Sequence, residues 1–189
     1  MRQEIITKTY LNFDELNKEQ QQKVIDSFRE DVHHDFEDFM ANDTYYNFKE
    51  LLSIIGFVNV TINYSGFCSQ GDGASFTGTY FHDDSPENIL RAIKSSHLDY
   101  ILEGTDIMEY LGKIENCEGV EEVYRVGRYY HENSIYCENE SVQLLAREIS
   151  RTIYEELESQ YEYLHTDEYI EERMKNNHYE FDSETLELV

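Results

Sequence analysis

A switch of hydrophobic period at Gly56 limits the folds that are open to this chain. In "DTYYNFKELLSIIGF", residues 43–57, apolar side chains recur every three or four residues, as on a helix, and Gly56 stands near the end. In "FVNVTINYSGF", from Phe57 onward, apolar residues alternate instead, which is the two-residue period of a half-buried strand. The switch predicts a helix that is followed directly by a strand.

The glycine-rich stretch "SGFCSQGDGASF", residues 65–76, separates this strand from a second one in "SFTGTYFH". Together they predict a β-hairpin whose loop is longer than the common two-residue turn. A second hairpin is expected in "VEEVYRVGRYYHENSIYCENE", where β-branched and tyrosine residues flank "HEN". A short strand is expected in the N-terminal "EIITKTYLNF".

Helical spacing fills most of the remaining chain. "DELNKEQQQKVIDSFREDV" begins with acidic residues, and "SPENILRAIKSS" has Ser85 as its cap with Pro86 at the first helical position. Near the C-terminus, Ser141 is expected to cap a long helix and Thr166 a shorter one. This order predicts an α+β fold, with an antiparallel sheet built from hairpins and several helices packed on it.

One domain is expected to span the whole chain. Its 189 residues suit a single domain, and 40% of them are apolar, which is enough for a packed core without disulfides or metals. Residues 141–178 are interpreted as the C-terminal helical part of that domain. No cofactor and no metal are expected.

The charge of the chain is its strongest global feature. Forty acidic residues against 15 basic ones give a formal net charge of −25. Because phosphate binding needs clustered Lys and Arg, direct binding of nucleic acid is not expected. The carboxylates are either solvated helix faces or an imitation of a nucleic-acid backbone that faces a basic protein.

Cysteine usage and hydropathy indicate the compartment. Cys68, Cys117 and Cys137 are an odd set without CxxC spacing. No signal peptide and no apolar run near the ~20 residues that a bilayer requires are apparent. We therefore expect a cytosolic chain with reduced thiols and no membrane contact.

Four blocks of this sequence resemble, in order and approximate spacing, a family of uncharacterised bacteriophage accessory proteins. The blocks are "FDEL", "SGFCSQGDGASFTG", "GRYYHENS" and "YEYLHTDEYIEERMKNNHYEF", and together they reach from about Phe13 to Phe181. The resemblance implies a phage protein in the host bacterial cytoplasm, and some relatives are labelled antitoxin or anti-restriction. Several relatives have a tryptophan beside or within "SGF", where this chain offers Tyr64 and Phe67.

The "SQGDGAS" loop is the first half of a candidate ligand site. Its polar side chains are those of Ser69, Gln70, Asp72 and Ser75, and amides in a glycine-rich turn can form a concavity for anions. The loop matches neither a dinucleotide-binding nor a Walker motif. The alternative is a long hairpin turn in which glycines supply positive φ and Asp72 bonds its own backbone.

"RYYHENS" is the second half of the candidate site. His131 is flanked by groups that can set its protonation and tautomer, Tyr129 or Tyr130 could stack on a base, and Arg128 could hold a phosphate. If both hairpins belong to one sheet, His131 could approach Asp72 in one polar pocket. The alternative is a polar turn with a surface histidine.

These features predict a non-enzymatic protein that antagonises a bacterial defence or regulatory system by binding. In one mode the hairpin pocket sequesters a nucleotide-like signal. In the other, the acidic C-terminal helices, with their interleaved tyrosines, mask a basic site on a host protein. The alternative is a small hydrolase that acts through the neighbourhood of Cys68, Ser69 and His131, although no GxSxG elbow supports it.

Overall fold

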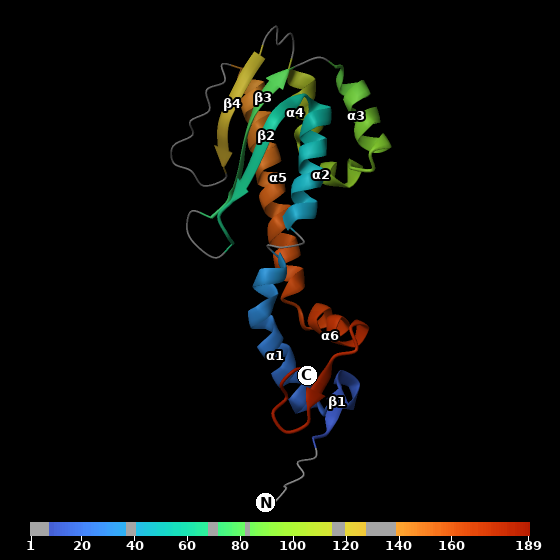
Figure 1. Ribbon diagram of the computed structural model, residues 1–189. Helices are drawn as coiled ribbons and strands as arrows, with labels where there is room; N and C mark the ends of the chain where they lie inside the picture. Colours follow the sequence, from blue (N-terminus) through green and yellow to red (C-terminus); the bar gives the residue numbers. More distant parts are fainter. Residues whose placement is uncertain (1–7, 37–40, 68–71, 82–83, 115–119, 128–138) are drawn as a thin grey trace, which may run out of the picture. The chain divides into compact units, whose positions relative to one another are not determined.

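The chain forms two compact units in the computed structural model (Figure 1). The first combines residues 1–40 with 159–189, and the second comprises residues 41–158. The residues described are 8–36, 41–67, 72–81, 84–114, 120–127 and 139–189. The α+β class is confirmed, whereas the single domain over residues 1–189 stays a prediction, because two compact units can still unfold as one.

A three-stranded antiparallel sheet organises the second unit. Its strands β2 (Phe57–Tyr64), β3 (Ala74–Phe81) and β4 (Val120–Gly127) lie in the order β2-β3-β4. The expected hairpin around the glycine-rich loop is therefore present as β2 and β3. β4 is the first arm of the second expected hairpin and pairs with β3, whereas the other arm, within residues 128–138, lies outside the described residues.

Gly56 makes the junction between helix α2 (Ala41–Ile55) and β2. Its φ is +113°, and a Cβ at this position would lie 2.2 Å from the carbonyl oxygen of Phe81. The Phe81 N–H donates to the Gly56 carbonyl at 2.9 Å. Because the two backbones approach this closely, only glycine fits where the hydrophobic period changes.

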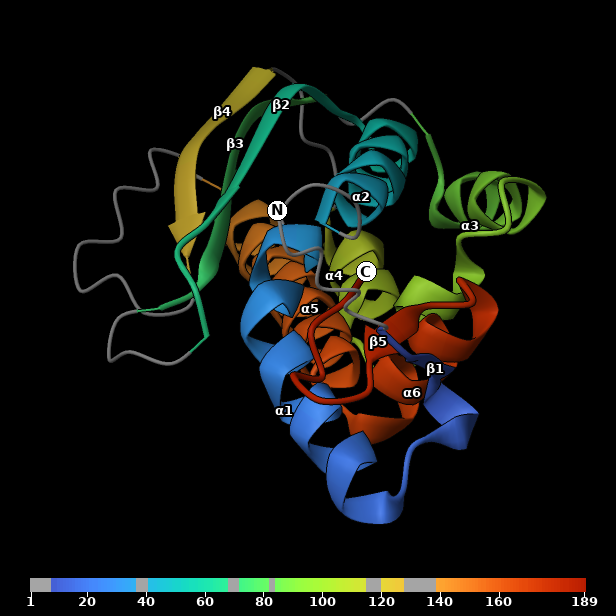
Figure 2. The same cartoon turned by 60° about the horizontal axis from the view of Figure 1, so that its bottom comes forward.

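The sheet buries one of its faces. Ile62 lies opposite Phe76 in the register, and both are buried. Thr61 and Asn63, the neighbours of Ile62 on β2, are exposed. Helices α2 and α5 (Glu140–Leu164) lie on the buried side (Figures 1 and 2). The apolar positions expected to face the core are buried on the part of α5 that belongs to this unit: Val142, Leu145, Ile149, Ile153 and Leu157.

Shorter helices complete the second unit, namely α3 (Pro86–Ser95), the 3-10 helix η3 (Asp99–Leu102) and α4 (Ile107–Lys113). The predicted cap of α3 is confirmed, because the Ser85 hydroxyl accepts from the Asn88 N–H.

The predicted cap of α5 is wrong. The Asn139 Oδ1 accepts from the backbone N–H groups of Ser141, at 2.9 Å, and Val142, at 3.2 Å. Ser141 itself lies inside the first turn. Asn and Ser are about equally good N-caps, so the sequence favoured the wrong one of two neighbouring candidates.

The first unit is built around helices α1 (Lys18–Asp35) and α6 (Asp167–Asn176). The short strands β1 (Tyr10–Asn12) and β5 (Glu180–Asp182) pair antiparallel, and the 3-10 helix η1 (Phe13–Glu15) follows β1. Thr166 caps α6 as predicted, because its hydroxyl accepts from the Tyr169 N–H at 3.2 Å. No described helix is both long and apolar enough to cross a membrane.

Candidate functional site

Two hydrogen bonds join the two ends of the glycine-rich loop at its base. The Ser65 N–H donates to the Gly73 carbonyl at 3.0 Å, and the Gly73 N–H donates to the Ser65 hydroxyl at 3.1 Å. Gly66 has a φ of +117°, and a Cβ there would lie 3.2 Å from a carboxylate oxygen of Asp72. These glycines therefore shape a turn, and Asp72 lies against the turn's own backbone.

Two of the predicted ligand residues lie within the described residues. Asp72 is half-buried beside Gly66, and Ser75 is a strand residue that is only 4% exposed. The others lie outside the described residues: Ser69, Gln70, Arg128, Tyr130 and His131. Cys68, the hydrolase candidate, is also outside them. The two-hairpin ligand site thus stays a prediction.

The glycine-rich loop and the last residue of β4 lie at the same end of the sheet. β2 runs toward the loop, β3 runs away from it, and β4 is antiparallel to β3 and so returns toward the loop. In the register Gly127, the last residue of β4, lies opposite Ser75. Gly127, which directly precedes the second stretch in the sequence, therefore lies beside the strand that leaves the glycine-rich loop.

The aromatic residues of the "SGF" block pack against the protein itself. The Phe67 ring stacks on Tyr64 with centroids 5.6 Å apart, and it also contacts Tyr154 on α5 at 5.6 Å. Tyr64 in turn lies 6.3 Å from Tyr45 on α2. This aromatic cluster ties the start of the loop to two helices.

Some carboxylates of the acidic C-terminal helices are paired with basic side chains of the chain itself, whereas others are exposed. Arg151 binds both Glu148 and Glu155, and Lys175 binds Glu171 at 2.6 Å. Glu162, Glu168 and Glu172 are exposed. The interleaved tyrosines differ as well: Tyr154 is buried, whereas Tyr163 is exposed and contacts Tyr169 edge-on.

A second acidic and aromatic surface begins on α2. Asp43, Tyr46, Asn47 and Glu50 fall within an arc of about 100° on this helix, opposite the buried residues Phe48, Leu51 and Leu52. Tyr46 is 70% exposed, the highest exposure among the exposed large apolar side chains of the described residues. The same spacing marks the surface in the sequence, as the polar face of an amphipathic helix.

Tyr100 on η3 extends this surface. The Asn47 side-chain amide donates to the Tyr100 hydroxyl at 3.1 Å, and Tyr100 is 48% exposed. Partial burial, and then the Glu156 carboxylate on α5, raise the pKa of the Tyr100 phenol. We call this set the Tyr46–Tyr100 surface: Asp43, Tyr46, Asn47, Glu50, Tyr100 and Glu156.

The Tyr46–Tyr100 surface combines negative charge with exposed aromatic rings. Its charged members are three carboxylates, and the one basic residue of α2, Lys49, lies on the flank of the arc. Exposed tyrosines are enriched in protein interfaces because a rigid ring buries area at low entropic cost. No sequence motif marks Tyr100 as part of this surface, since its contact with Asn47 joins residues 53 positions apart.

The net charge of the chain is shared by both units. The second unit has 21 acidic and eight basic residues, and the first has 19 and seven. The acidity therefore does not distinguish one unit from the other. Among the described residues each unit also has two exposed tyrosines, Tyr10 and Tyr163 in the first and Tyr46 and Tyr100 in the second.

Comparison with known proteins identifies one family. Residues 39–167 match a domain of unknown function, DUF8835, and this range contains the whole second unit, residues 41–158. No curated protein and no solved structure matches the chain. Because the match covers more than half of its length, the chain belongs to the DUF8835 family.

Proposed function

We propose that this chain is a phage accessory protein that works by binding and not by catalysis. It masks a basic site on a bacterial defence or regulatory protein and so antagonises that protein in the host cytoplasm. The observation that supports this best is the Tyr46–Tyr100 surface, with two exposed tyrosines among three carboxylates. The surface lies within the part of the chain that matches DUF8835.

The physical roles of the two kinds of side chain differ. Arg and Lys of the partner are attracted by the carboxylates and can lie over the faces of Tyr46 and Tyr100, which offer cation–π contacts. A net charge of −25 accelerates encounter with a basic partner and makes that encounter sensitive to salt. Most of the affinity comes from the tyrosines, because exposed ion pairs contribute little.

Capture from a bacterial lysate tests this proposal. The immobilised full-length chain should retain a basic protein at low salt and release it as the Debye length falls from ~10 Å at 0.1 M to ~3 Å at 1 M. Tyr46→Ala with Tyr100→Ala should weaken binding of the isolated partner about tenfold or more, as expected for interface aromatics.

The matched control is Tyr10→Ala, which removes an exposed tyrosine of the first unit. It should leave binding unchanged. Equal binding by the control and the double variant would contradict the proposed surface.

A second candidate function is sequestration of a nucleotide-like signal at the end of the sheet. The pairing of Ser75 with Gly127 supports it, since the pairing starts both predicted stretches from one end. A nucleotide should then raise the melting temperature, and Asp72→Ala or His131→Ala should abolish the rise. Turnover beyond one equivalent of product would instead favour the hydrolase and contradict both binding functions.

A further inference from the structure

The first unit contains a pocket that the proposed function does not use. It has a volume of about 550 Å³ and lies between α1, the end of α6 and the C-terminal residues 185–188. Its apolar lining consists of Val24, Phe28, Tyr179, Leu186 and Leu188. This size is in the range of small-molecule sites in proteins.

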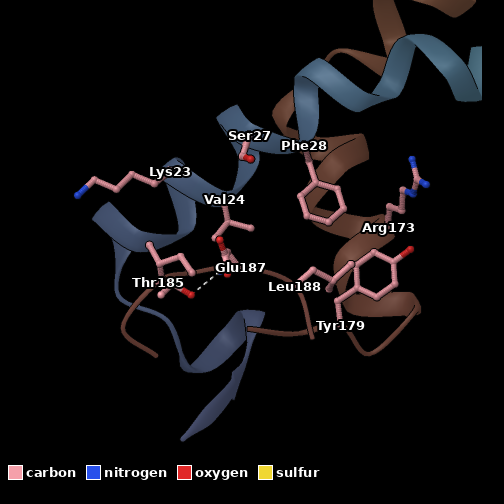
Figure 3. Close-up of a pocket in the computed structure, with 10 residues that line it drawn as sticks. Lys23, Val24, Ser27, Phe28, Arg173, Tyr179, Thr185, Glu187 and Leu188 are labelled. Atoms are coloured by element: carbon pink, nitrogen blue, oxygen red, sulfur yellow. Dashed lines mark hydrogen bonds between the residues drawn. The ribbon is translucent and has the colours of Figure 1, made fainter. Parts of the chain in front are cut away.

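Aromatic rings form the floor of the pocket. The rings of Phe28 and Tyr179 lie 5.7 Å apart and are tilted by 34°. In Figure 3, these two rings and the Leu188 side chain gather around the same space. A ligand would therefore need an apolar body, either a ring system or a chain.

Hydrogen bonds and an ion pair of Asp182 hold the C-terminal wall of the pocket in place. The Asp182 carboxylate accepts from the N–H groups of Glu184, at 3.0 Å, and Thr185, at 3.3 Å, and also pairs with Lys8 at 3.1 Å. The backbone of Asp182 bonds to Glu187 and Leu186, at 3.0 and 2.9 Å. The wall thus exists before a ligand arrives, which lowers the entropic cost of binding.

The charges around the pocket are opposite to those of the unit. The first unit has 19 acidic and seven basic residues, yet the pocket is lined by two basic residues, Lys23 and Arg173, and by one acidic residue, Glu187. Figure 3 shows Lys23 and Arg173 on opposite sides of the pocket, with the charged ends of both side chains directed outward from the space between Phe28, Tyr179 and Leu188. Lys23 pairs at 2.8 Å with Glu19, and an exposed (i, i+4) pair of this kind is weak enough to be exchanged for a ligand anion.

We propose that this pocket binds a small amphipathic anion, with an apolar body between Phe28, Tyr179 and Leu188 and an acidic group at the rim beside Lys23 or Arg173. The acidic group is a carboxylate, sulfonate or phosphate, and either of the two cations can pair with any of these groups. The site shares no residue with the Tyr46–Tyr100 surface, which belongs to the other unit. All of its lining residues lie outside the DUF8835 match, residues 39–167.

Two fluorescent dyes test this inference on the full-length chain. 8-Anilinonaphthalene-1-sulfonate carries one anionic group, and N-phenyl-1-naphthylamine has the same rings without it. The sulfonate dye should saturate at one per chain and bind at least threefold more tightly than the neutral dye. A chain of net charge −25 repels an anion in general, so this preference requires a local cationic site.

Variants locate the binding. Lys23→Ala with Arg173→Ala should remove the preference for the anionic dye, whereas Lys18→Ala with Arg147→Ala removes two exposed basic residues outside the pocket and should keep it. Leu188→Ala should lower the affinity of the chain for both dyes. Dodecanoate and phenyl phosphate, added as competitors, distinguish a carboxylate from a phosphate ligand.

Three results would overturn the proposal. Dye binding that does not saturate would show that the pocket is not a defined binding site. Equal affinity of the two dyes for the unmodified chain would contradict an anionic ligand. A preference for the anionic dye that survives Lys23→Ala with Arg173→Ala would contradict it as well. Each variant must keep the far-UV spectrum and the melting temperature of the parent, so that loss of binding is not loss of folding.

Discussion

Gly127, the last residue of β4, lies opposite Ser75 on β3, three residues after Asp72 in the glycine-rich loop. The pairing brings the starts of two sequence-predicted stretches to one end of the sheet, although the residues lie 52 positions apart in the chain. His131 follows Gly127 by four residues in the sequence and lies outside the described residues. The pairing is the structural support for testing Asp72 and His131 together.

Gly56→Ala should destabilise the second unit strongly. The new Cβ would lie 2.2 Å from the Phe81 carbonyl oxygen, at a φ of +113°, so both a clash and backbone strain are introduced. We expect a loss of about 3 kcal/mol or more in the free energy of unfolding, measured by urea denaturation.

Gly112→Ala is the matched control. Gly112 lies on α4, and a Cβ there would have nothing within 4 Å. The substitution should be neutral or stabilise the chain by about 0.5 kcal/mol, because alanine is the better helix former. Equal effects of the two substitutions would contradict the close approach at Gly56.

Asn139→Ala should cost about 1 kcal/mol of stability, because it leaves the N–H groups of Ser141 and Val142 without their acceptor. Ser141→Ala should change stability by less than about 0.5 kcal/mol, since the Ser141 hydroxyl makes only a 3.5 Å contact with the Lys113 carbonyl. Thermal unfolding of the two variants compares the predicted cap with the observed one. A larger loss for Ser141→Ala would reverse the assignment.

Phe67→Ala should loosen the glycine-rich loop and cost about 2 kcal/mol, because it removes the contacts with Tyr64 and Tyr154 from a half-buried ring. Hydrogen exchange should accelerate at Gly73, whose N–H donates to the Ser65 hydroxyl at the base of the loop.

Tyr46→Ala is the control, because Tyr46 is an exposed aromatic residue of the same unit. Its stability change should stay within about 0.5 kcal/mol. Unchanged exchange at Gly73 in Phe67→Ala would show that this ring does not anchor the loop.

Glu148 should make the second unit sensitive to acid. The hydrogen bond from Arg151 lowers the pKa of Glu148 below its ordinary value of 4.5, and the Asp106 N–H, which donates to the same carboxylate, adds to the effect. The unfolded chain then binds more protons than the folded one between the two pKa values. The stabilisation is therefore fully present above pH 4.5 and is lost as the pH falls through the folded pKa.

Glu148→Gln should accordingly be less stable than the parent at pH 7, and the difference should shrink as the pH falls below about 4. Urea unfolding at several pH values measures this. Glu103→Gln, at an exposed carboxylate of the same unit, should show little difference at any pH. A gap between Glu148→Gln and the parent that stays constant down to about pH 2 would contradict the role of the Arg151 hydrogen bond.

Local patterns were sufficient to predict much of the secondary structure. The change of period at Gly56, the Ser85 cap with Pro86, and the Thr166 cap each depend on residues that are neighbours in the chain, and the structure has them as expected. Helical spacing, turns and caps are determined within one or two turns of chain, so a single sequence carries them. The α5 cap failed within this same local range, because Asn139 and Ser141 compete for one position.

Pairings between distant segments were decided only by the tertiary structure. β4 adds to β3 across a connection that contains α3, η3 and α4, and the Asn47 amide meets the Tyr100 hydroxyl across 53 residues. The pocket of the first unit likewise joins residues near positions 25 and 185. Neither hydrophobic period nor capping encodes these partners, because they arise when several amphipathic faces bury their apolar sides at once.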